Sequence, residues 1–544
     1  MADKDDNDKK GLFWADQVAK KILERKTFRY SDKKIPGFDV YTSKSAASLS
    51  GVLHIGRLSD VIRHISVHRA LLDKGAKSRV IWVADDIDPL RKVPKGVPAS
   101  YEKYIGAPVN SIPDFENCHK SYAEHHIDDY LKVIHKYAFE DLEICRTSEE
   151  YRKGSFRPFI KKLLANADKV REIQNEYRTN PLKKGWTPWR AVCENCGKII
   201  TPHVKLAEGG RAVYVCRDYR FEASLARGCG HKGESNPLKD DGKLAYKSEW
   251  AAQWAFWKVT CEGAGKEYQV PNSAYWVNHK ICEQVLDFPA PEYFFYEHLF
   301  VDGVKMSASL GNVIYPSDWL KVATPQLLRF FYNKRLMMSR SFSWKELPQL
   351  YDEYDEASAI FSGKKALENE KEAAHIKRQY EIANRRSSAE KPLRMSFMHA
   401  TMLAQTFGDE KGIISSLKKT GQYDKNAEKQ LLERVAHASE WVKLHAPEEY
   451  KFEVKEAVPE STRKKLSPKQ KKAVKEFAKL LKSKEWKQNE LVEETRKIFE
   501  SEQIKPQEFF EAAYLVLLGK EKGPRLVPFV LTLREKATAL FEQV

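Results

Sequence analysis

Two apolar segments, separated by a loop and an amphipathic stretch, constrain the fold of this chain more than any other feature. Residues 38–42 (FDVYT) predict a strand, and apolar residues then recur at helical spacing, so a helix is expected to begin near Leu58. Gly75 is suited to end that helix. Residues 79–84 (RVIWVA) form a continuous apolar run, which is typical of a buried parallel strand. Strand, helix and strand make a βαβ unit, so the sequence predicts an α/β domain with a parallel sheet.

The character of the sequence changes along the 544 residues and predicts five parts. Residues 1–150 and 250–320 are expected to form the two halves of one α/β domain, because strand-like apolar runs return in the second segment. Between them, residues 151–249 are expected to form an insertion that contains a cluster of cysteines. Residues 321–389 predict a helical connecting domain, and residues 390–544 predict an all-α region in which helical periodicity persists almost to the end.

Composition and charge exclude several classes of protein. No run of about 18 uncharged apolar residues occurs, so we expect no membrane span. The polar first residues lack the apolar core of a secretory signal, which favours a cytoplasmic location. Lys and Arg number 93 against 76 Asp and Glu, a formal net charge of +17. That excess favours a polyanionic partner such as nucleic acid, although a solvated basic surface without a ligand explains it equally well.

Residues 50–57 (SGVLHIGR) lie in the loop between the first strand and the helix. A helix N-terminus presents free N–H groups and a positive dipole end to a phosphate, here with Ser50 beside it. Gly51 and Gly56 allow the backbone to approach a nucleotide closely. His54 can donate a hydrogen bond to an α-phosphate as negative charge builds. A tight turn with a surface histidine is the alternative, and the segment alone favours that alternative.

A second segment changes this balance. Lys305 can neutralise a pyrophosphate leaving group, and Ser307 and Ser309, with Ala308 between them, can bind its oxygens. In this order, the HIG and KMSAS segments resemble the HIGH and KMSKS motifs of class I aminoacyl-tRNA synthetases. The resemblance implies that both segments flank Mg²⁺-bound ATP on a Rossmann-type sheet, with His54 and Lys305 as the catalytic residues.

Longer segments are similar to the class I lysyl-tRNA synthetases. They are residues 85–94 (DDIDPLRKVP), 112–125 (IPDFENCHKSYAEH), 242–254 (GKLAYKSEWAAQW), 262–268 (EGAGKEY) and 508–526 (EFFEAAYLVLLGKEKGPRL). The resemblance spans most of the chain and implies an ATP-dependent lysine–tRNA ligase. Such an enzyme forms lysyl-adenylate and transfers the lysyl group to the 3′-terminal ribose of tRNA(Lys). It also implies a helical anticodon-binding domain at the C-terminal end; we expect a monomer, although the sequence does not specify the oligomeric state.

Carboxylates at the end of the second strand are candidates to bind the amino acid. Asp85, Asp86 and Asp88 follow an apolar strand, where open α/β sheets place their ligands. A lysine ammonium that enters a closed site needs a charged or strongly polar partner, because an unpaired buried cation is very costly. Helix capping, or ion pairing with Arg91 and Lys92, explains these acids equally well.

The resemblance implies that two aromatic positions wall the amino-acid pocket. They are Tyr246, where the family has tryptophan, and Tyr268, where it has histidine, so stacking on an alkyl chain is retained. Ser48 and Glu267 are further candidates for amino-acid binding. The two departures leave other readings open, namely a class I synthetase for glutamate, cysteine or arginine, or a tRNA-binding relative without catalysis.

Cysteines in the insertion predict a metal site. Cys193, Cys196, Cys216 and Cys229 offer two thiolates on one knuckle and two from later loops, which suits tetrahedral Zn²⁺ in a structural role. His203 or His231 is the alternative fourth ligand. The remaining cysteines, Cys118, Cys145, Cys261 and Cys282, are expected to be buried and inert.

Residues 463–487 are strongly basic, with Phe477 and Trp486 among the cations. Cations can contact phosphates while rings stack on anticodon bases. The alternative, a solvated helix with both aromatic rings in the core, is favoured for this segment alone. With the family resemblance, tRNA contact is expected somewhere within residues 390–544.

Overall fold

The computed structural model describes residues 13–49, 51–139, 142–207, 211–239, 241–306, 312–384 and 392–544. The chain divides into two compact units. The first comprises Met1–Trp319, Pro325–Phe342 and Leu367–Ser388, and the second comprises Leu320–Thr324, Ser343–Ala366 and Ala389–Val544. The chain passes between the units several times, and the finer division into five parts stays a prediction.

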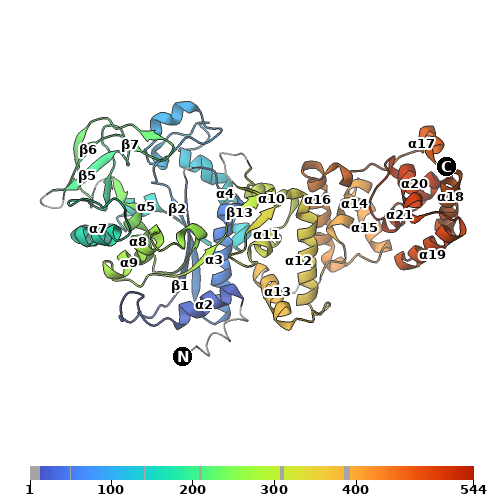
Figure 1. Ribbon diagram of the computed structural model, residues 1–544, viewed down its shortest axis with the longest axis horizontal. Coiled ribbons are helices and arrows are strands. Elements are labelled where there is room, and N and C mark those ends of the chain that lie inside the picture. The colour runs from blue at the N-terminus through green and yellow to red at the C-terminus, as the bar shows by residue number, and fades with distance from the viewer. Residues whose placement is uncertain are drawn as a thin grey trace. The chain divides into compact units, whose positions relative to one another are not determined.

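A five-stranded parallel sheet forms the core of the first unit (Figure 1). Its order is β12-β11-β1-β2-β3, with β12 at Glu292–Tyr296, β11 at Val259–Gly265, β1 at Tyr41–Ser48, β2 at Ser78–Asp85 and β3 at Leu142–Arg146. All four ladders are parallel. The chain proceeds outward from β1 in one direction and returns to its other side through β11, so the order is that of a Rossmann sheet, with its topological switch point between β1 and β11. The predicted fold class is confirmed.

The first βαβ unit differs from prediction at its boundaries. The strand begins at Tyr41 rather than at residue 38 and continues to Ser48, and α3 (Ile55–Asp73) begins three residues before Leu58. Most of β1 is buried although it is polar: Lys44, Ala46 and Ser48 line a cavity, and Ser45 on the other face donates a hydrogen bond to Asp60. Hydrophobic periodicity could not detect such a strand. Gly75, at φ +79°, follows the helix end as predicted.

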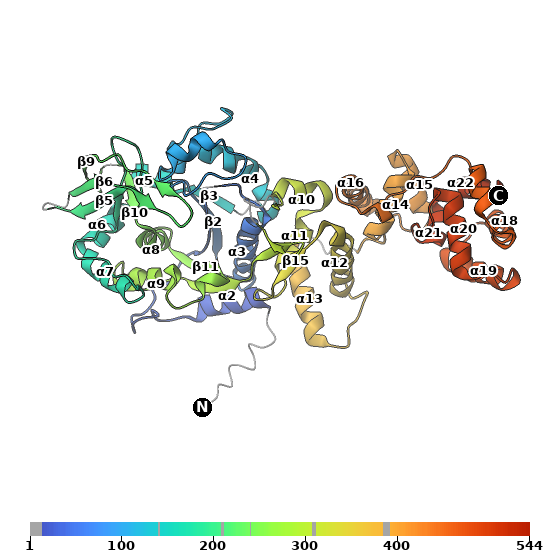
Figure 2. The same cartoon turned by 45° about the horizontal axis from the view of Figure 1, so that its top comes forward.

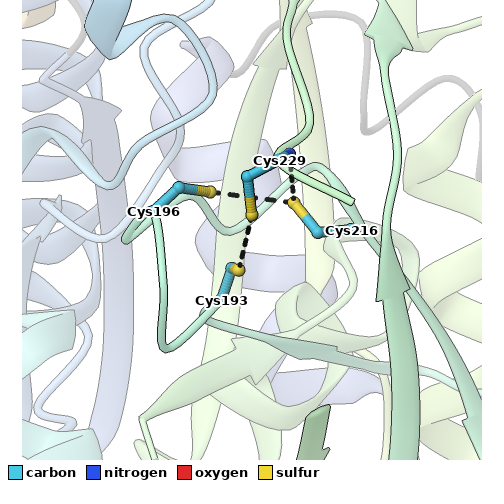
Figure 3. Close-up of side chains that lie close together, drawn as sticks. All are labelled: Cys193, Cys196, Cys216 and Cys229. Atoms are coloured by element: carbon cyan, nitrogen blue, oxygen red, sulfur yellow. Dashed lines mark hydrogen bonds between the residues drawn. The ribbon is translucent and has the colours of Figure 1, made fainter. Parts of the chain in front are cut away.

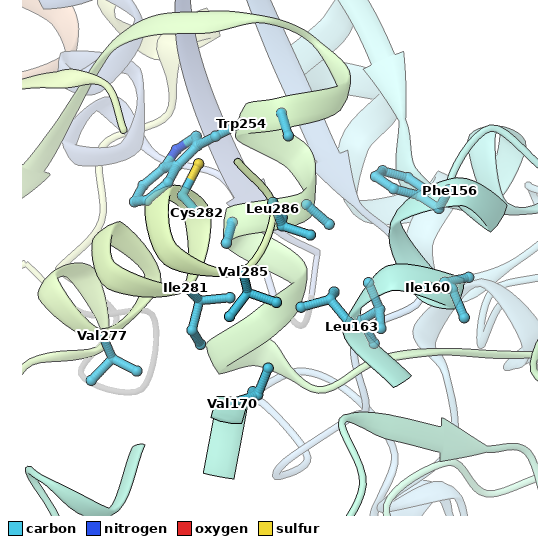
Figure 4. Packing of buried hydrophobic residues seen from close by; sticks show 14 of the residues in the cluster. Phe156, Ile160, Leu163, Val170, Trp254, Val277, Ile281, Cys282, Val285 and Leu286 are labelled. Carbon is cyan, nitrogen blue, oxygen red and sulfur yellow. The ribbon is translucent and has the colours of Figure 1, made fainter. Parts of the chain in front are cut away.

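Helices cover both faces of the sheet (Figures 1 and 2). On one face lie α2 (Trp14–Glu24) and α3, whose apolar side chains pack with Phe294 of β12. On the other lie α8 (Tyr246–Phe256) and α9 (Ala274–Gln284), which share a core with Phe295, the next residue of that strand. Figure 4 shows how α6 (Arg157–Ala165) and α7 (Ala167–Asn175) extend this core with Ile160, Leu163 and Val170. Phe294 and Phe295 therefore pack against the helices on opposite faces of the sheet.

An insertion connects β3 to β11. After α5 (Thr147–Lys153), α6 and α7, β4 (Trp189–Ala191) pairs with β10 (Gly242–Leu244). Between these strands lies a three-stranded antiparallel sheet of β5 (Pro202–Leu206), β6 (Ala212–Cys216) and β9 (Lys232–Ser235). A short hairpin, β7 (Tyr219–Arg220) and β8 (Leu225–Ala226), completes it. The insertion therefore returns the chain to the sheet through β10.

Further elements complete the first unit. They are α4 (Tyr122–Ala138), β13 (Leu299–Val301), β14 (Val304–Lys305), α11 (Pro325–Tyr332), β15 (Arg340–Phe342) and α13 (Glu370–Ala383), with α10 (Pro316–Val322) where the chain enters the second unit. The small sheet β14-β13-β15 carries Lys305 on its edge strand.

The second unit is helical throughout its described residues, as predicted. Its α-helices are α12 (Leu347–Phe361), α14 (Phe397–Thr406), α15 (Glu410–Lys419), α16 (Glu428–Leu444), α17 (Glu460–Lys465), α18 (Pro468–Ser483), α19 (Gln488–Ser501), α20 (Pro506–Leu518), α21 (Leu526–Leu533) and α22 (Glu535–Glu542). Phe477 is fully buried. The Trp486 indole N–H donates to Leu480 O at 2.7 Å, and its ring packs against the helical core, so both rings serve packing rather than stacking on a base. The core alternative for these rings is correct. Across the described ranges, no helix combines the length and the apolar character needed to cross a membrane.

Candidate active site

A cavity of about 540 Å³ opens where the carboxyl ends of β1, β2 and β11 meet. Its walls also include the N-terminal end of α3, one face of α8 and the residues around β14. His54 and Lys305, 251 positions apart in the sequence, both line it. The cavity thus lies at the topological switch point, where open α/β sheets bind their ligands.

His54 caps α3 and has a fixed tautomer. Its Nδ1 accepts a hydrogen bond from Gly56 N at 3.1 Å, so the ring proton is on Nε2, which is free to donate. Burial, and then the charge of Arg57, lowers the pKa of His54 to about 4, so the ring is neutral at pH 7. A Cβ on Gly56 would lie 2.8 Å from the His54 ring, so glycine is required for this close approach. The result is a neutral donor at a helix N-terminus.

The second phosphate-handling segment begins beside the first. Lys305 is exposed on β14, and Met306 Cε lies 3.5 Å from the position of a Cβ on Gly56. Beyond that segment, Ile314 O accepts a hydrogen bond from Ile55 N, in the first turn of α3, at 2.9 Å. The flanks of both motifs are therefore bound to the same helix end.

Four of the predicted ATP-binding residues lie outside the described residues, namely Ser50, Ser307, Ala308 and Ser309. Gly51 is described but does not line the cavity. The phosphate-handling residues that the structure places at the cavity are therefore His54, Gly56 and Lys305.

A buried ion pair forms the floor of the cavity and was not predicted. Lys44 of β1 lies with Nζ 3.0 and 3.1 Å from the two carboxylate oxygens of Glu262 on β11. The indole N–H of Trp250 donates to Glu262 at 2.8 Å, and that of Trp254 donates to its other oxygen. The Lys44 side chain is 0% exposed. Lys44 stands among polar residues, so the sequence around it did not predict a strand. Its position beside Glu262 is evident only from the fold.

The three predicted acids have three different environments. Asp85 lines the cavity and accepts hydrogen bonds of 2.9 Å from Thr147 Oγ1 and Gln253 Nε2. Burial, with the charge of Asp88, raises the pKa of Asp85. No ion pair to Asp85 occurs among the described residues. Asp85 is therefore a half-buried carboxylate without an ion pair among the described residues, although the charges of Lys243 and Lys44 lower its pKa in part.

Asp86 and Asp88 already have partners. Asp86 does not line the cavity; it accepts from Ser148 N at 2.8 Å in the first turn of α5, so capping explains it better than amino-acid contact. Asp88 lines the cavity and pairs with Lys243 Nζ at 2.6 Å, rather than with Arg91 or Lys92.

Lys243 contacts a second acid as well. Its Nζ lies 2.7 Å from Glu249, which also lines the cavity. Burial raises the pKa of Glu249 to about 7. Lys243 and Glu249 lie in the segment 242–254 that carries the family resemblance, but the pairing of Lys243 with Asp88, 155 positions away, could be identified only from the fold.

Aromatic rings form part of the cavity wall. The hydroxyl groups of Tyr246 and Tyr268 lie 3.0 Å apart, and Trp250 stacks on Tyr246 with ring centroids 5.6 Å apart. Both tyrosines line the cavity, as do Ser48 and Glu267. Glu267 is paired with His298 at 3.0 Å. The aromatic faces suit a ligand with an alkyl chain, and the Asp85 carboxylate, which makes no ion pair among the described residues, suits a cationic group.

The four cysteines of the insertion come together as predicted (Figure 3). The Sγ atoms of Cys193 and Cys229 lie 3.6 Å apart, and those of Cys196 and Cys216 lie 3.7 Å apart. A tetrahedral metal with bonds of about 2.3 Å to sulfur requires sulfur separations of about 3.8 Å. His231 instead contacts Glu194 at 2.6 Å.

A second cluster of metal-binding side chains was not predicted. Asp114, Cys118, His119 and His125 place one ligand atom each within 4.8 Å of the others. Cys118 Sγ lies 3.0 Å from His119 Nδ1 and 3.3 Å from His125 Nδ1, and His125 Nδ1 lies 3.1 Å from Asp114. The spacing Asp-x₃-Cys-His-x₅-His could have revealed it. One oxygen, one sulfur and two nitrogen ligands can hold a tetrahedral divalent cation.

This cluster corrects one expectation about the scattered cysteines. Cys118 is exposed rather than buried, because its thiol faces the two histidines, and Cys145 is half-buried. Cys261 and Cys282 are buried, as expected.

The chain is similar to several known proteins. Residues 12–386 match the family model described as tRNA synthetases class I (K). The chain is 30% identical to the lysine–tRNA ligase of Methanosphaera stadtmanae, over 96% of this chain and 97% of that relative. It is 31% identical to the lysine–tRNA ligase of Methanocaldococcus jannaschii, over 96% of this chain and 98% of that relative. A solved glutamate tRNA ligase from Elizabethkingia meningosepticum covers 92% of this chain and 98% of its own, with a TM-score of 0.41 and 14% identity.

Proposed function

Because the chain belongs to the class I tRNA synthetases, in the K group whose model matches residues 12–386, we propose that it is a lysine–tRNA ligase. It activates lysine with ATP and transfers the lysyl group to the 3′-terminal ribose of tRNA(Lys). The observation that carries this proposal is the meeting of His54 and Lys305 at one cavity on the switch point of the sheet.

In the first step, the carboxylate of lysine attacks the α-phosphorus of ATP, and pyrophosphate leaves. His54 donates its Nε2 proton as a hydrogen bond to an α-phosphate oxygen, where negative charge develops. Lys305 neutralises the departing pyrophosphate. When bound with ATP, Mg²⁺ would supply further charge neutralisation at the phosphates. The enzyme positions groups and stabilises charge, and no covalent bond to the protein forms.

In the second step, the 2′-hydroxyl of the terminal ribose attacks the carbonyl carbon of lysyl-adenylate. The ester bond forms, and AMP leaves with the electron pair of the broken mixed anhydride. The same cavity holds the adenylate for this transfer.

The lysine side chain is proposed to lie between the aromatic wall and Asp85. Its alkyl chain packs on Tyr246 and Tyr268, and its ammonium pairs with the Asp85 carboxylate, which makes no ion pair among the described residues. Asp88 and Glu249 share the single ammonium of Lys243, so its charge balances one of the two carboxylates. Ser48 and Glu267 complete the lining.

Zn²⁺ is proposed at both clusters, in a structural role. The four thiols of the insertion have the separations that a Zn–S₄ site requires, and neither cluster lines the active cavity. Within residues 390–544, the helical unit is proposed to bind the anticodon region of tRNA(Lys), and the enzyme is proposed to act as a cytoplasmic monomer. Among the described residues, the exposed lysines of α18 supply cations for phosphate contact.

The test is ATP–pyrophosphate exchange in the presence of tRNA(Lys), with lysine and separately with glutamate, cysteine and arginine. Lysine-dependent exchange, reduced roughly 10²-fold in His54→Ala, is expected. Exchange with one of the other amino acids would replace the substrate assignment. Absence of exchange with all of them, in protein that binds tRNA, would show a relative that no longer catalyses the reaction.

A further inference from the structure

Three carboxylates and one ammonium group lie close together in the active cavity. Asp85, Asp88 and Glu249 line this cavity, and we call them the acid cluster. The Nζ atom of Lys243 lies 2.6 Å from Asp88 and 2.7 Å from Glu249. The side chains of Lys243 and Glu249 are each 4% exposed, so water screens their charges little. Asp85 makes no ion pair within the described part of the chain.

Two helices hold the carboxylates of Asp85 and Glu249 one helical turn apart. On α5, Thr147 donates a hydrogen bond to Asp85 at 2.9 Å. Tyr151, four residues later, donates one to Glu249 at 2.7 Å. On α8, Gln253 donates to Asp85 at 2.9 Å and lies four residues after Glu249 itself. Residues four apart lie on the same face of a helix, so both helices place these two acids side by side.

The acid cluster carries more negative charge than Lys243 can balance. One ammonium balances one carboxylate, and an ionised carboxylate that leaves water without a cation is costly. The other buried lysine of the cavity, Lys44, binds both oxygens of Glu262, although its charge also acts on Asp85. A bound proton is therefore expected to reduce the charge of the acid cluster when the site is empty.

The ionisable groups that face Glu249 come from three neighbouring segments. They are Lys243 of β10, Tyr151 of α5, and Asp85 and Asp88 at the end of β2, and of these four only Lys243 is a cation.

The other elements that pack against α8 direct their ionisable groups elsewhere. Glu262 of β11 binds Lys44, and Lys162 of α6 donates to Leu286 O at 2.9 Å. Burial holds the pKa of His279, on α9, well below its usual value, so this ring is neutral.

The proton belongs mainly to Glu249 and Asp85. Burial raises the pKa of Glu249 to about 7, with Lys243 acting against this rise and the two aspartates adding to it. Burial also raises the pKa of Asp85. The pKa of Asp88 is instead lowered by Lys243, which outweighs the effect of burial. Interacting acids of this kind titrate together, so the proton is a property of the cluster.

We propose that the acid cluster holds one proton in the empty site and releases it when the side-chain ammonium of the amino acid enters. This inference rests on the proposed function and adds Glu249 as the residue that makes the site require a cation. The O–H bond of the Glu249 carboxyl group breaks, its electron pair stays on the carboxylate, and the proton passes to water. The ammonium thus replaces the proton, and the net charge of the site is unchanged. A neutral side chain cannot replace it.

Isothermal titration of the full chain with lysine tests this proposal. At pH 7, the binding enthalpy is measured in buffers of different ionisation enthalpy, and the slope gives the number of protons released. The affinity for lysine is measured from pH 6 to pH 8. About half a proton is expected at pH 7, because a group whose pKa is about 7 is then half protonated. Lysine favours the ionised acid, so its affinity is full above pH 8 and falls roughly tenfold towards pH 6.

Two variants of the acid cluster change this behaviour in different ways. Glu249→Gln imitates the protonated acid and leaves Lys243 paired with Asp88, so the buried cation keeps a partner. It is expected to bind lysine weakly, with no proton release and no change of affinity from pH 6 to pH 8. Asp88→Asn leaves Lys243 to Glu249 alone, so the fall in affinity moves to lower pH. The control, Glu172→Gln, changes an exposed carboxylate of α7 outside the cavity and keeps the native behaviour.

Lysine binding without proton release would overturn the proposal, as would release that persists in Glu249→Gln. A purely structural role of Glu249 would weaken binding in that variant but retain its pH dependence, which also contradicts the proposal. Lysine-dependent exchange in a chain that releases no proton refutes this linkage alone. Proton release that depends on Glu249, in a chain without lysine-dependent exchange, refutes the proposed function and leaves the linkage intact. Absence of lysine binding would overturn both.

Discussion

Glu262→Gln is the substitution that tests the buried floor of the cavity most sharply. Glu262 binds Lys44 through both oxygens and accepts the indole N–H groups of Trp250 and Trp254. In the variant the carboxylate charge is lost, so Lys44 must stay charged without a counter-ion or give up its proton. The new amide NH₂ also faces one of the indole N–H groups, which places a donor against a donor.

The expected cost follows from the burial of the pair. Removing one partner of a buried ion pair costs about 3–5 kcal/mol, and the 0% exposure of Lys44 excludes relief by solvent. In Lys44→Met/Glu262→Gln both charges are absent, and the cost relative to the native chain falls to about 1–2 kcal/mol. The two substitutions are therefore coupled by at least about 2 kcal/mol.

Urea unfolding, followed by tryptophan fluorescence of native, single and double variants, measures these free energies. Trp250 and Trp254 report directly on the loss of the network. A cost below about 1 kcal/mol for Glu262→Gln, or additive costs in the double variant, would refute the reasoning, because either result means that Lys44 does not depend on this carboxylate.

Three further predictions concern the site and the metals. Asp85→Asn should raise the KM for lysine at least tenfold and leave the KM for ATP nearly unchanged; an unchanged lysine KM would remove Asp85 from the amino-acid site. Elemental analysis of the native chain should find about two zinc ions, and Cys229→Ser and Cys118→Ser should each lose one, whereas a single zinc lost only in Cys229→Ser would exclude the second site. Burial lowers the pKa of His54 to about 4, so the ring stays neutral as pH falls from 8 to 6, and kcat/KM should show no step from this group; a step near 6.5 that disappears in His54→Asn would contradict its burial.

The sequence predicted the sheet where its strands are apolar and failed where they are polar. Residues 79–84 identified β2 because its side chains are buried on both faces. The part of β1 beyond Thr42 was taken for a loop, since Ser43, Lys44 and Ser45 are buried but polar. Such a strand is detectable only through the partners that compensate its polar groups, and these lie far away in the sequence.

Prediction of the active site from the sequence has the same limit, because some of its contacts join residues that are distant in the sequence. Local motifs located His54, Lys305 and the four clustered thiols, because each motif contains its own chemistry. The role of Asp86 and the ion pairs of Lys243 depend on residues brought close by the fold, Ser148 in one case and Asp88 with Glu249 in the other. The second metal cluster is the exception: its ligands lie within one short segment, and their spacing was readable.

A crystal structure of the chain with a non-hydrolysable ATP analogue and lysine tests the central claim most directly. The account predicts an α-phosphate oxygen within hydrogen-bond distance of His54 Nε2, with the β- and γ-phosphates toward Lys305 and the adenosine in the same cavity. An analogue bound outside that cavity, or one whose phosphates contact neither residue, would contradict it.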